Sequence, residues 1–419
     1  MRNARVRLVS TKLVRSPCSG TDDTYALSPC DQLSLTTATA RASFWKQRFD
    51  TTALEKCLEL VLEDLPFLAG RVLRGKEPLM KVRVARLADG DVLGITLSHY
   101  GMRWPRFLAH FAARYRQAAT GIEPAPELLL RSVDRSGLSS AGLATELHEE
   151  PFGLSKALPA VKASLGDYCR AASVLLRDSS KKKDLVILHV PQTRVKQLKA
   201  DVFGATKDAA ITTGDVVQAL AGMLVNAASG KPLLPEPPKY QVVLVQLQGV
   251  HPAYFGNSVH LLPVQLPLGR EAPTGDAYLS SLAELAALIR TATKAFRAHP
   301  EASVGALAQL EQLVQTPIHR MLGWLAGHRL PYATCTTNYI GHLPADKDLD
   351  FGFGEGPVAM RWLVTPFGSD MAVIRPAMPP FSEGLFCHIP LSAHKARRLQ
   401  RHPLLQALAP DARFLGSQA

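Results

Sequence analysis

The sequence passes from a strand pattern to a helix pattern at Ile95-Thr96-Leu97-Ser98-His99-Tyr100-Gly101-Met102-Arg103-Trp104. The apolar residues before Ser98 predict a buried strand, and residues 105–119 have the apolar spacing of a helix. His99 therefore follows the end of a strand and precedes a glycine and a helix, a placement that suits a general base facing a cleft. Taken alone as one of 13 histidines, it is more simply a histidine satisfied in the core or at the surface.

The composition is that of a globular protein with two domains. Of 419 residues, 47% are hydrophobic and 20% are charged, and a chain of this length exceeds one ordinary core. The net charge of +12 is consistent with nucleic acid, a membrane surface or an anionic small molecule as partner. The basic residues are scattered, and no zinc finger, RNA-binding aromatic signature or recognition helix is visible. We therefore expect no nucleic-acid partner.

Cysteine spacing and hydropathy predict a reducing, cytoplasmic location. The six cysteines lie far apart without a CxxC pair, which argues against a structural zinc site and a disulfide framework. No run approaches the roughly 18 apolar residues of a membrane span, so no membrane partner is expected. The first 21 residues carry five basic side chains and no acid, as transit peptides do. Because residues 6–9 have a strand pattern and residues 27–31 a turn pattern, we expect this segment to belong to the fold.

Apolar periodicity predicts a mixed α/β protein. Helices are expected over residues 51–64, 105–119, 193–199, 215–228, 278–296 and 304–325, with Thr51 or Thr52 capping the first. Strands are expected over residues 80–85, 92–97, 185–190, 241–247, 259–266, 332–338, 359–366, 371–375 and 385–391. Prolines and a lysine-rich run interrupt residues 121–184, which we interpret as a long connection between two halves.

Six short segments follow one another in an order found in a known family. They are Leu27-Ser28-Pro29-Cys30-Asp31, Leu65-Pro66-Phe67-Leu68-Ala69-Gly70-Arg71, Ser98-His99, Leu130-Arg131-Ser132-Val133-Asp134-Arg135-Ser136, Tyr254-Phe255-Gly256-Asn257 and Asp350-Phe351-Gly352-Phe353-Gly354. In this order they resemble the LSxxD, FYPLAGR, HxxxD, DRS, YFGN and DFGWG motifs of the BAHD acyl-CoA-dependent acyltransferases. The YFGN motif is unchanged, and the last motif exchanges one aromatic residue for another.

The resemblance implies an α/β fold of two domains related to chloramphenicol acetyltransferase, with mixed sheets and flanking helices. Residues 1–134 would form the N-terminal acyltransferase domain with the histidine motif, and residues 135–184 a crossover linker. Residues 185–419 would form the C-terminal acyltransferase domain with the YFGN and DFGFG segments. Acyl-CoA, as co-substrate, and a small-molecule alcohol or amine acceptor would enter a channel between the domains from opposite faces. The resemblance implies a monomer active in secondary metabolism, with no permanently bound cofactor or metal.

The resemblance also assigns roles to particular residues. His99 would remove a proton from the acceptor, because a neutral alcohol is a poor nucleophile. Thr337 and Tyr339 occupy the place of the family's threonine and tryptophan beside the developing oxyanion, with a spacing two residues longer. Thr212 and Thr213 match a serine- or threonine-rich stretch near the CoA pantetheine and phosphates, where a helix start suits an anion. Ordinary helix capping is an equal alternative for these two threonines.

The two glycine-containing motifs are expected to have mainly structural roles. The glycines of the DFGFG segment would let a loop turn sharply beside the CoA channel. A nucleotide-binding loop is a poor interpretation of residues 352–356, because the strand–loop–helix context is missing. The residues concerned are Phe351 and Gly352, expected near CoA, and the structural motif residues Asp350, Gly354, Tyr254, Gly256 and Asn257.

The sequence departs from the family pattern in two places. Arg103 replaces the motif aspartate and Trp104 the glycine after it, and no arginine lies between residues 241 and 254 to pair with that aspartate. Only 28 residues separate Gly70 from His99, where relatives carry a much longer segment. These departures leave open an alternative to acyl transfer: a catalytically degenerate member that binds CoA or a metabolite without turnover.

Overall fold

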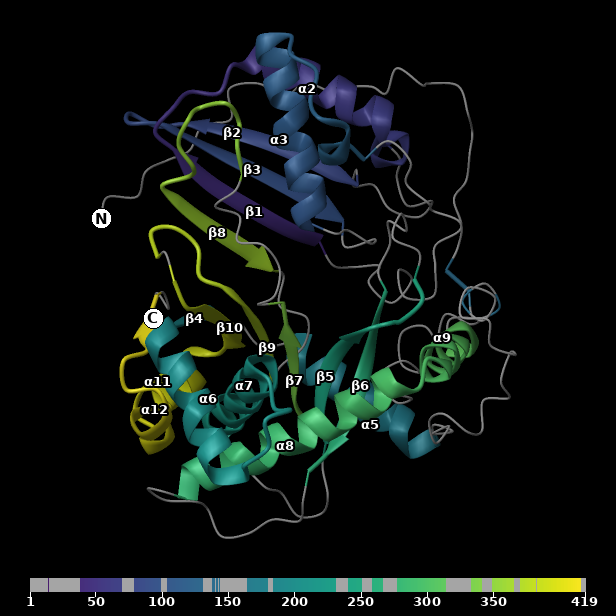
Figure 1. Cartoon of the computed structure of the whole chain (residues 1–419), viewed down its shortest axis with the longest axis vertical. Helices are drawn as coiled ribbons and strands as arrows, with labels where there is room; N and C mark the ends of the chain where they lie inside the picture. The colour runs from purple at the N-terminus through teal and green to yellow at the C-terminus, as the bar shows by residue number, and fades with distance from the viewer. Residues whose placement is uncertain are drawn as a thin grey trace.

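The protein contains two sheets with helices packed against them (Figure 1). The computed structural model describes residues 14, 38–69, 79–98, 104–130, 138–139, 141, 143, 164–179, 184–230, 240–250, 258–266, 277–313, 333–340, 349–364, 370–381 and 383–415. We call the four-stranded sheet and its helices the first lobe, at the top of Figure 1, and the seven-stranded sheet and its helices the second lobe. The strand expected over residues 6–9 and the turn over residues 27–31 lie outside the described residues.

The first lobe is an antiparallel sheet in the order β2-β3-β1-β8, with two helices packed against it. Residues 93, 95 and 97 of the central strand β3 are buried, as alternation predicts for a sheet with one covered face. They join the apolar face of the helices in one core that contains Phe107 and Phe111. The elements are β1 (Ala38–Trp45), α2 (Thr51–Asp64), β2 (Met80–Arg86), β3 (Asp91–Ser98), α3 (Trp104–Thr120) and β8 (Ala359–Val364).

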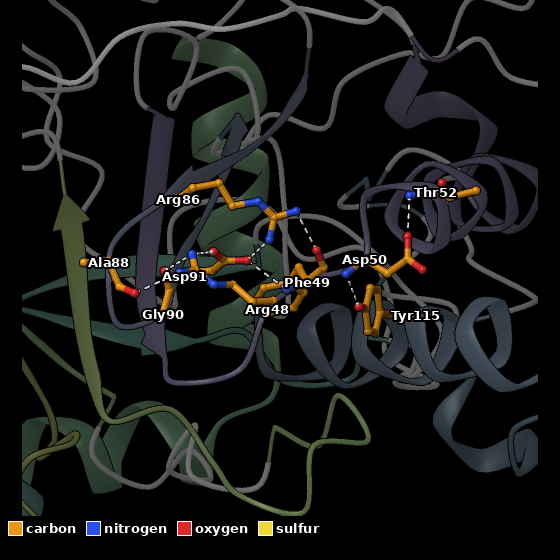
Figure 2. Close-up of polar contacts among 9 residues, drawn as sticks. All are labelled: Arg48, Phe49, Asp50, Thr52, Arg86, Ala88, Gly90, Asp91 and Tyr115. Atoms are coloured by element: carbon orange, nitrogen blue, oxygen red, sulfur yellow. Dashed lines mark hydrogen bonds and ion pairs between the residues drawn. The ribbon is translucent and has the colours of Figure 1, made fainter.

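A polar network fastens the start of α2 to the β2–β3 hairpin (Figure 2). The buried Asp91 carboxylate accepts hydrogen bonds from the Phe49 amide at 2.8 Å and from Arg48 Nη1 at 2.9 Å, and it pairs with Arg86. The Asp50 carboxylate caps α2 by accepting from the Thr52 amide at 2.7 Å. The expectation that Thr51 or Thr52 caps this helix was wrong, because both lie inside its first turn while Asp50 precedes it with an extended backbone.

The second lobe is a mixed sheet in the order β11-β4-β10-β9-β7-β5-β6. Strands β5, β7 and β9 are parallel, and the remaining pairs are antiparallel. Because parallel strands share a direction, the carboxyl ends of these three strands lie at one edge of the sheet. The strands are β4 (Asp184–Val190), β5 (Tyr240–Gln246), β6 (Val259–Gln265), β7 (Ala333–Tyr339), β9 (Met371–Pro376), β10 (Leu385–Leu391) and β11 (Arg413–Phe414).

Four helices of the second lobe, α6, α8, α11 and α12, pack against the buried helix α7. Helix α6 is longer than the expected 193–199, because Val202 continues the buried apolar face of Val195 and Leu198. Helix α5 lies within the stretch that the sequence suggested was only a connection. The expected helix over residues 304–325 is α9, whose described part ends at Leu313. The helices are α5 (Leu165–Ser179), α6 (Gln192–Thr206), α7 (Thr213–Ser229), α8 (Ala277–Ala298), α9 (Glu301–Leu313), α11 (Ala393–Gln400) and α12 (Pro403–Leu408).

Strand β8 links the lobes, because it comes late in the chain but lies in the first sheet. It pairs with β1, from Thr39 opposite Val364 to Phe44 opposite Ala359, and points toward the second lobe in Figure 1. One apolar cluster also spans both lobes: it contains Trp45 of the first and Phe386 of the second. The division into residues 1–134 and 185–419 stays a prediction, and the chain re-enters the first sheet at residue 359.

Candidate active site

The predicted base His99 follows β3 directly but lies outside the described residues, as do Arg103, Tyr254, Gly256 and Asn257. The described flanks are Ser98, the last residue of β3, and Trp104, the first of α3. Ser98 pairs with Ala38 of β1, and the neighbouring Thr39 pairs with Val364 at the end of β8. The carboxyl ends of β3 and β8 therefore lie at the same end of the first sheet, and the chain continues from there into residues 99–103.

Four of the predicted site residues lie together in the second lobe, although more than 100 residues of sequence separate their segments. Thr337 and Tyr339 belong to β7, and Thr212 and Thr213 mark the start of α7. A Cβ placed on Gly214, in the first turn of α7, would lie 2.9 Å from the Tyr339 ring. Helix α7 therefore runs antiparallel to β7, and its amino end lies at the carboxyl end of that strand.

Thr337 is fully buried between β7 and α7. Its hydroxyl donates to Gln218 Oε1 of α7 and accepts from Gln241 Nε2 of β5, each at 3.4 Å. These bonds satisfy two buried amides that would otherwise be costly to leave unpaired. The side chain has no solvent-accessible surface from which to contact a substrate, so the structure shows a packing role. Its catalytic role stays a prediction.

Tyr339 lies half-buried against the amino end of α7. Burial raises the pKa of its phenol above the usual value, and the negative charge of Asp215 raises it further. The phenol is therefore protonated at neutral pH and keeps a proton to donate. This agrees with the chemistry expected of a residue that replaces a tryptophan, but its contact with a reacting group stays a prediction.

The start of α7 is closed by a capping box. Thr212 Oγ1 accepts from the Asp215 amide at 3.4 Å, and Asp215 Oδ2 accepts from the Thr212 amide at 2.8 Å and from its hydroxyl at 2.7 Å. Helix capping is therefore observed for Thr212, whereas Thr213 is the first residue of the helix. The Asp215 carboxylate also places a negative charge beside the helix dipole, which opposes a bound anion there. A contact with CoA stays a prediction for both threonines.

The DFGFG segment packs against the first lobe rather than beside β7. Phe351 is 2% exposed, with its ring centroid 5.2 Å from those of Trp45 and Phe49, and Phe353 lies 5.1 Å from Phe49. This aromatic cluster explains the conformation that the loop adopts. The CoA contact predicted for Phe351 and Gly352 stays a prediction.

The two glycines and the aspartate of the segment shape its turn. Gly352 and Gly354 have positive φ angles of 82° and 73°, which favour glycine. The Asp350 carboxylate accepts from the Gly352 amide at 2.7 Å and pairs with Arg116 of α3 at 3.0 Å. These contacts hold the turn in place, and the structural role expected of Asp350 and Gly354 stays a prediction.

Two polar residues on the other face of β7 were missed by the sequence reasoning. Thr336 and Asn338 lie opposite Met371 and Val373 of β9, so they point away from α7. Alternation along the strand places these two residues on the face opposite Thr337 and Tyr339, the residues that match the family motif. Among the described residues there is no group of three or more histidine, cysteine, aspartate or glutamate side chains that could hold a metal ion. The helices in the described ranges are too short or too polar to cross a membrane.

Comparison with solved structures identifies the architecture. The sequence matches no protein-family model and no curated protein. The structure of TRI101 from F. sporotrichioides with coenzyme A and T-2 aligns with 94% of this chain and 100% of its own, at 13% identity and a TM-score of 0.66. Vinorine synthase aligns with 97% of this chain and 98% of its own, at 15% identity and a TM-score of 0.59. Both are BAHD acyltransferases.

The chain has the BAHD acyltransferase fold. The first condensation domain of the calcium-dependent antibiotic synthetase also aligns, over 93% of this chain and 96% of its own, at 14% identity and a TM-score of 0.57. The two-domain chloramphenicol-acetyltransferase-like architecture predicted from six short motifs is thus confirmed, with flanking helices and with a mixed sheet in the second lobe. In this structure the carboxyl end of β3, the strand that precedes His99, and the carboxyl end of β7 belong to different lobes.

Proposed function

We propose that this protein is an acyltransferase that moves an acyl group from acyl-CoA to a hydroxyl or amine of a small molecule. The observation that carries the proposal is the alignment, over nearly the whole chain, with TRI101 structures that hold coenzyme A together with T-2 or deoxynivalenol. Those structures place a CoA thiol carrier and a small molecule in a protein of this fold. Fold alone does not select a reaction, so the proposal also depends on His99 and on the order of the six motif-like segments in the sequence.

His99 is the general base in this proposal. Its imidazole takes the proton of the acceptor hydroxyl or amine while the acceptor atom bonds to the thioester carbonyl carbon. The carbonyl electrons move to oxygen, and the resulting oxyanion needs a fixed donor. When the carbon–oxygen double bond re-forms, the carbon–sulfur bond breaks, and CoA leaves with the proton that His99 returns. Atoms and charge balance without a metal or a second cofactor.

The described residues fix the strand that precedes the proposed base. Strand β3, which leads into His99, pairs with β1 along its whole length and with β2 from Asp91 to Leu97. Its other end is anchored by Asp91, which pairs with Arg48 and Arg86. A strand held at both edges positions the residue that follows it more firmly than a loop would, and small errors in position cost large factors in rate.

The test is release of free thiol from a panel of acetyl-, benzoyl-, hydroxycinnamoyl- and fatty acyl-CoA, each offered with alcohol and amine acceptors. We expect turnover by the parent chain and a loss of about 10²- to 10⁴-fold in kcat for His99→Ala, the usual contribution of a general base. His394→Ala, which removes an exposed histidine on α11, is the matched control and should keep the parental rate. Full turnover by His99→Ala contradicts the mechanism.

A catalytically degenerate protein is the competing proposal, and Arg103 in place of the motif aspartate favours it. It predicts a rise in melting temperature with CoA or acyl-CoA and no thiol release across the panel. We further propose that the protein is a cytoplasmic monomer that acts in secondary metabolism. Size-exclusion chromatography with light scattering checks the monomer, and a molecular mass of twice 45.5 kDa would contradict it.

A further inference from the structure

Strand β7 presents different side chains to its two sides. Thr337 lies opposite Ala372, and Tyr339 opposite Ile374, both of which pack in the core around α7. Thr336 and Asn338 alternate with them and therefore point to the opposite face of the sheet. The family motif alone does not say which of these two pairs can meet a substrate.

The face that carries Asn338 looks toward the first lobe. Its partner Val373 belongs to the apolar cluster that also contains Trp45 and Phe111 of the first lobe. Ile340, the residue after β7, packs against the same cluster. The α7 face, in contrast, belongs to a separate core made of second-lobe residues. Asn338 is thus on the side of β7 from which a ligand between the lobes could be reached.

Two polar side chains on this face, those of Thr336 and Asn338, are unused within the part of the chain that the structure describes. Thr336 and Asn338 are half-buried, and neither side chain forms a hydrogen bond there. On the opposite face Thr337 bonds to both Gln218 and Gln241. A half-buried amide with unfilled donors is costly unless it meets water or a ligand. The amide of Asn338 is therefore available in a way that the Thr337 hydroxyl is not.

The position of Asn338 along the strand also suits a ligand. It is the penultimate residue of β7, the middle one of the parallel strands β5, β7 and β9. Ligands of open α/β sheets bind outside the carboxyl ends of the parallel strands. Thr336 lies one pleat further back on the same face, so it can line the approach without reaching the edge.

We propose that Asn338 donates a hydrogen bond from Nδ2 to the thioester oxygen as that oxygen becomes negative. This inference deepens the proposed acyl transfer and depends on it. The oxygen gains charge when the acceptor adds to the carbonyl carbon and loses it when the carbon–sulfur bond breaks. Asn338 keeps its protons throughout, because an amide stabilises an oxyanion without ionising. The role expected from the motif for Thr337 and Tyr339 thereby passes to the opposite face of the strand.

The test compares Asn338→Ala and Asn338→Asp with the parent full-length chain, using the acyl-CoA that gives the fastest thiol release. Loss of one oxyanion donor should lower kcat by about 10²- to 10³-fold, with KM for acyl-CoA within about threefold of the parent. Asn338→Asp should be slower still, because a carboxylate repels the oxyanion. Asn338→Gln, which keeps the amide, should recover part of kcat.

Control variants separate this role from folding. Asn338→Ala should keep the parental melting temperature, because the amide makes no bond to be lost. Thr334→Val, at the amino end of the same strand, removes a hydroxyl bonded to the Tyr240 carbonyl at 3.4 Å. It should lower the melting temperature and leave kcat unchanged.

Three outcomes overturn the proposal in different ways. If Asn338→Ala keeps the parental kcat, Asn338 is not the oxyanion donor. If the variant raises only KM, Asn338 binds the substrate and does not stabilise the oxyanion. A loss of kcat in Thr337→Val at an unchanged melting temperature returns the role to the α7 face. If the parent chain releases no thiol from any acyl-CoA, the proposed function itself has failed. That result is distinct, because it appears before any Asn338 variant is compared.

Discussion

His388 of β10 shows how burial determines the ionisation of a single side chain. It is 1% exposed, and neither ring nitrogen has a hydrogen-bond partner among the described residues. Burial, and to a smaller extent the charges of Arg375 and Arg361, lower the pKa of His388 from its usual 6.5 to about 3. The imidazole is therefore neutral at physiological pH, and it would be forced to protonate only if the fold opened.

We expect His388 to make the protein less stable in mild acid. As pH falls below 6.5, the unfolded chain takes up a proton on this histidine while the folded protein does not. The contribution of neutral His388 to the free energy of unfolding is therefore present above pH 6.5. It is lost as the pH falls toward about 3, at up to about 1.4 kcal/mol per pH unit. Between about pH 7 and about pH 5 the parent should lose about 2 kcal/mol more than His388→Leu.

Urea unfolding of the parent and His388→Leu at the two pH values measures this difference. The leucine fills much of the same volume, so its effect at the higher pH reports packing, and the change with pH reports ionisation. Equal pH dependence in parent and variant would show that the histidine of the folded protein titrates normally.

At the scale of elements, the DFGFG segment packs an aromatic side chain into the core of the first lobe. Phe351 lies between Trp45, Phe49 and Tyr115, with ring centroids 5.2 to 5.6 Å apart. The chain reaches this cluster from β7 of the second lobe and continues into β8 of the first. An aromatic side chain at the crossing point therefore holds the returning segment in place.

Phe351→Ala should destabilise the protein by about 3–5 kcal/mol, because it removes a buried aromatic ring and leaves a cavity. Phe203→Ala is the matched control, since Phe203 of α6 is 49% exposed and should change stability by less than about 1 kcal/mol. Chemical denaturation followed by circular dichroism measures both. Similar small losses in the two variants would mean that the aromatic cluster contributes little to stability.

At the scale of the whole molecule, the lobes are expected to unfold together. Strand β8 completes the first sheet, and an apolar cluster continues from Trp45 to Phe386 across both lobes. Removing either lobe would expose this shared surface. Cooperative unfolding follows when the interface between parts is as apolar as their cores.

Tryptophan fluorescence and far-ultraviolet circular dichroism should therefore give one coincident thermal transition. Three of the four tryptophans belong to elements of the first lobe: Trp45 in β1, Trp104 in α3 and Trp362 in β8. Circular dichroism reports helices, including α7 and α8 of the second lobe. Leu220→Ala, a buried truncation in α7, should shift both signals by the same amount. Two separated transitions would show that the lobes are independent.

The sequence alone was sufficient for the elements and for the kind of fold. The helix over 51–64 and the strand over 385–391 were predicted at the residues observed, because one buried helix face leaves a regular apolar spacing and a strand buried on both faces leaves a continuous apolar run. Local capping was less reliable: the acceptor of α2 is Asp50 rather than a threonine, since several neighbouring residues have capping side chains. Short motifs in a fixed order predicted the two-domain architecture that comparison with solved structures confirmed.

Only the tertiary structure decided which side chains share a site. Strand β8 joins the first sheet although it follows most of the second in sequence, and no local pattern encodes such a long-range pairing. The two faces of β7 are both covered, so alternation gives no sign of which face meets the other lobe. A shift of one residue exchanges Thr337 for Asn338, because successive side chains of a strand point to opposite faces. Residue spacing specifies the elements, whereas the pairing of strands and lobes specifies the site.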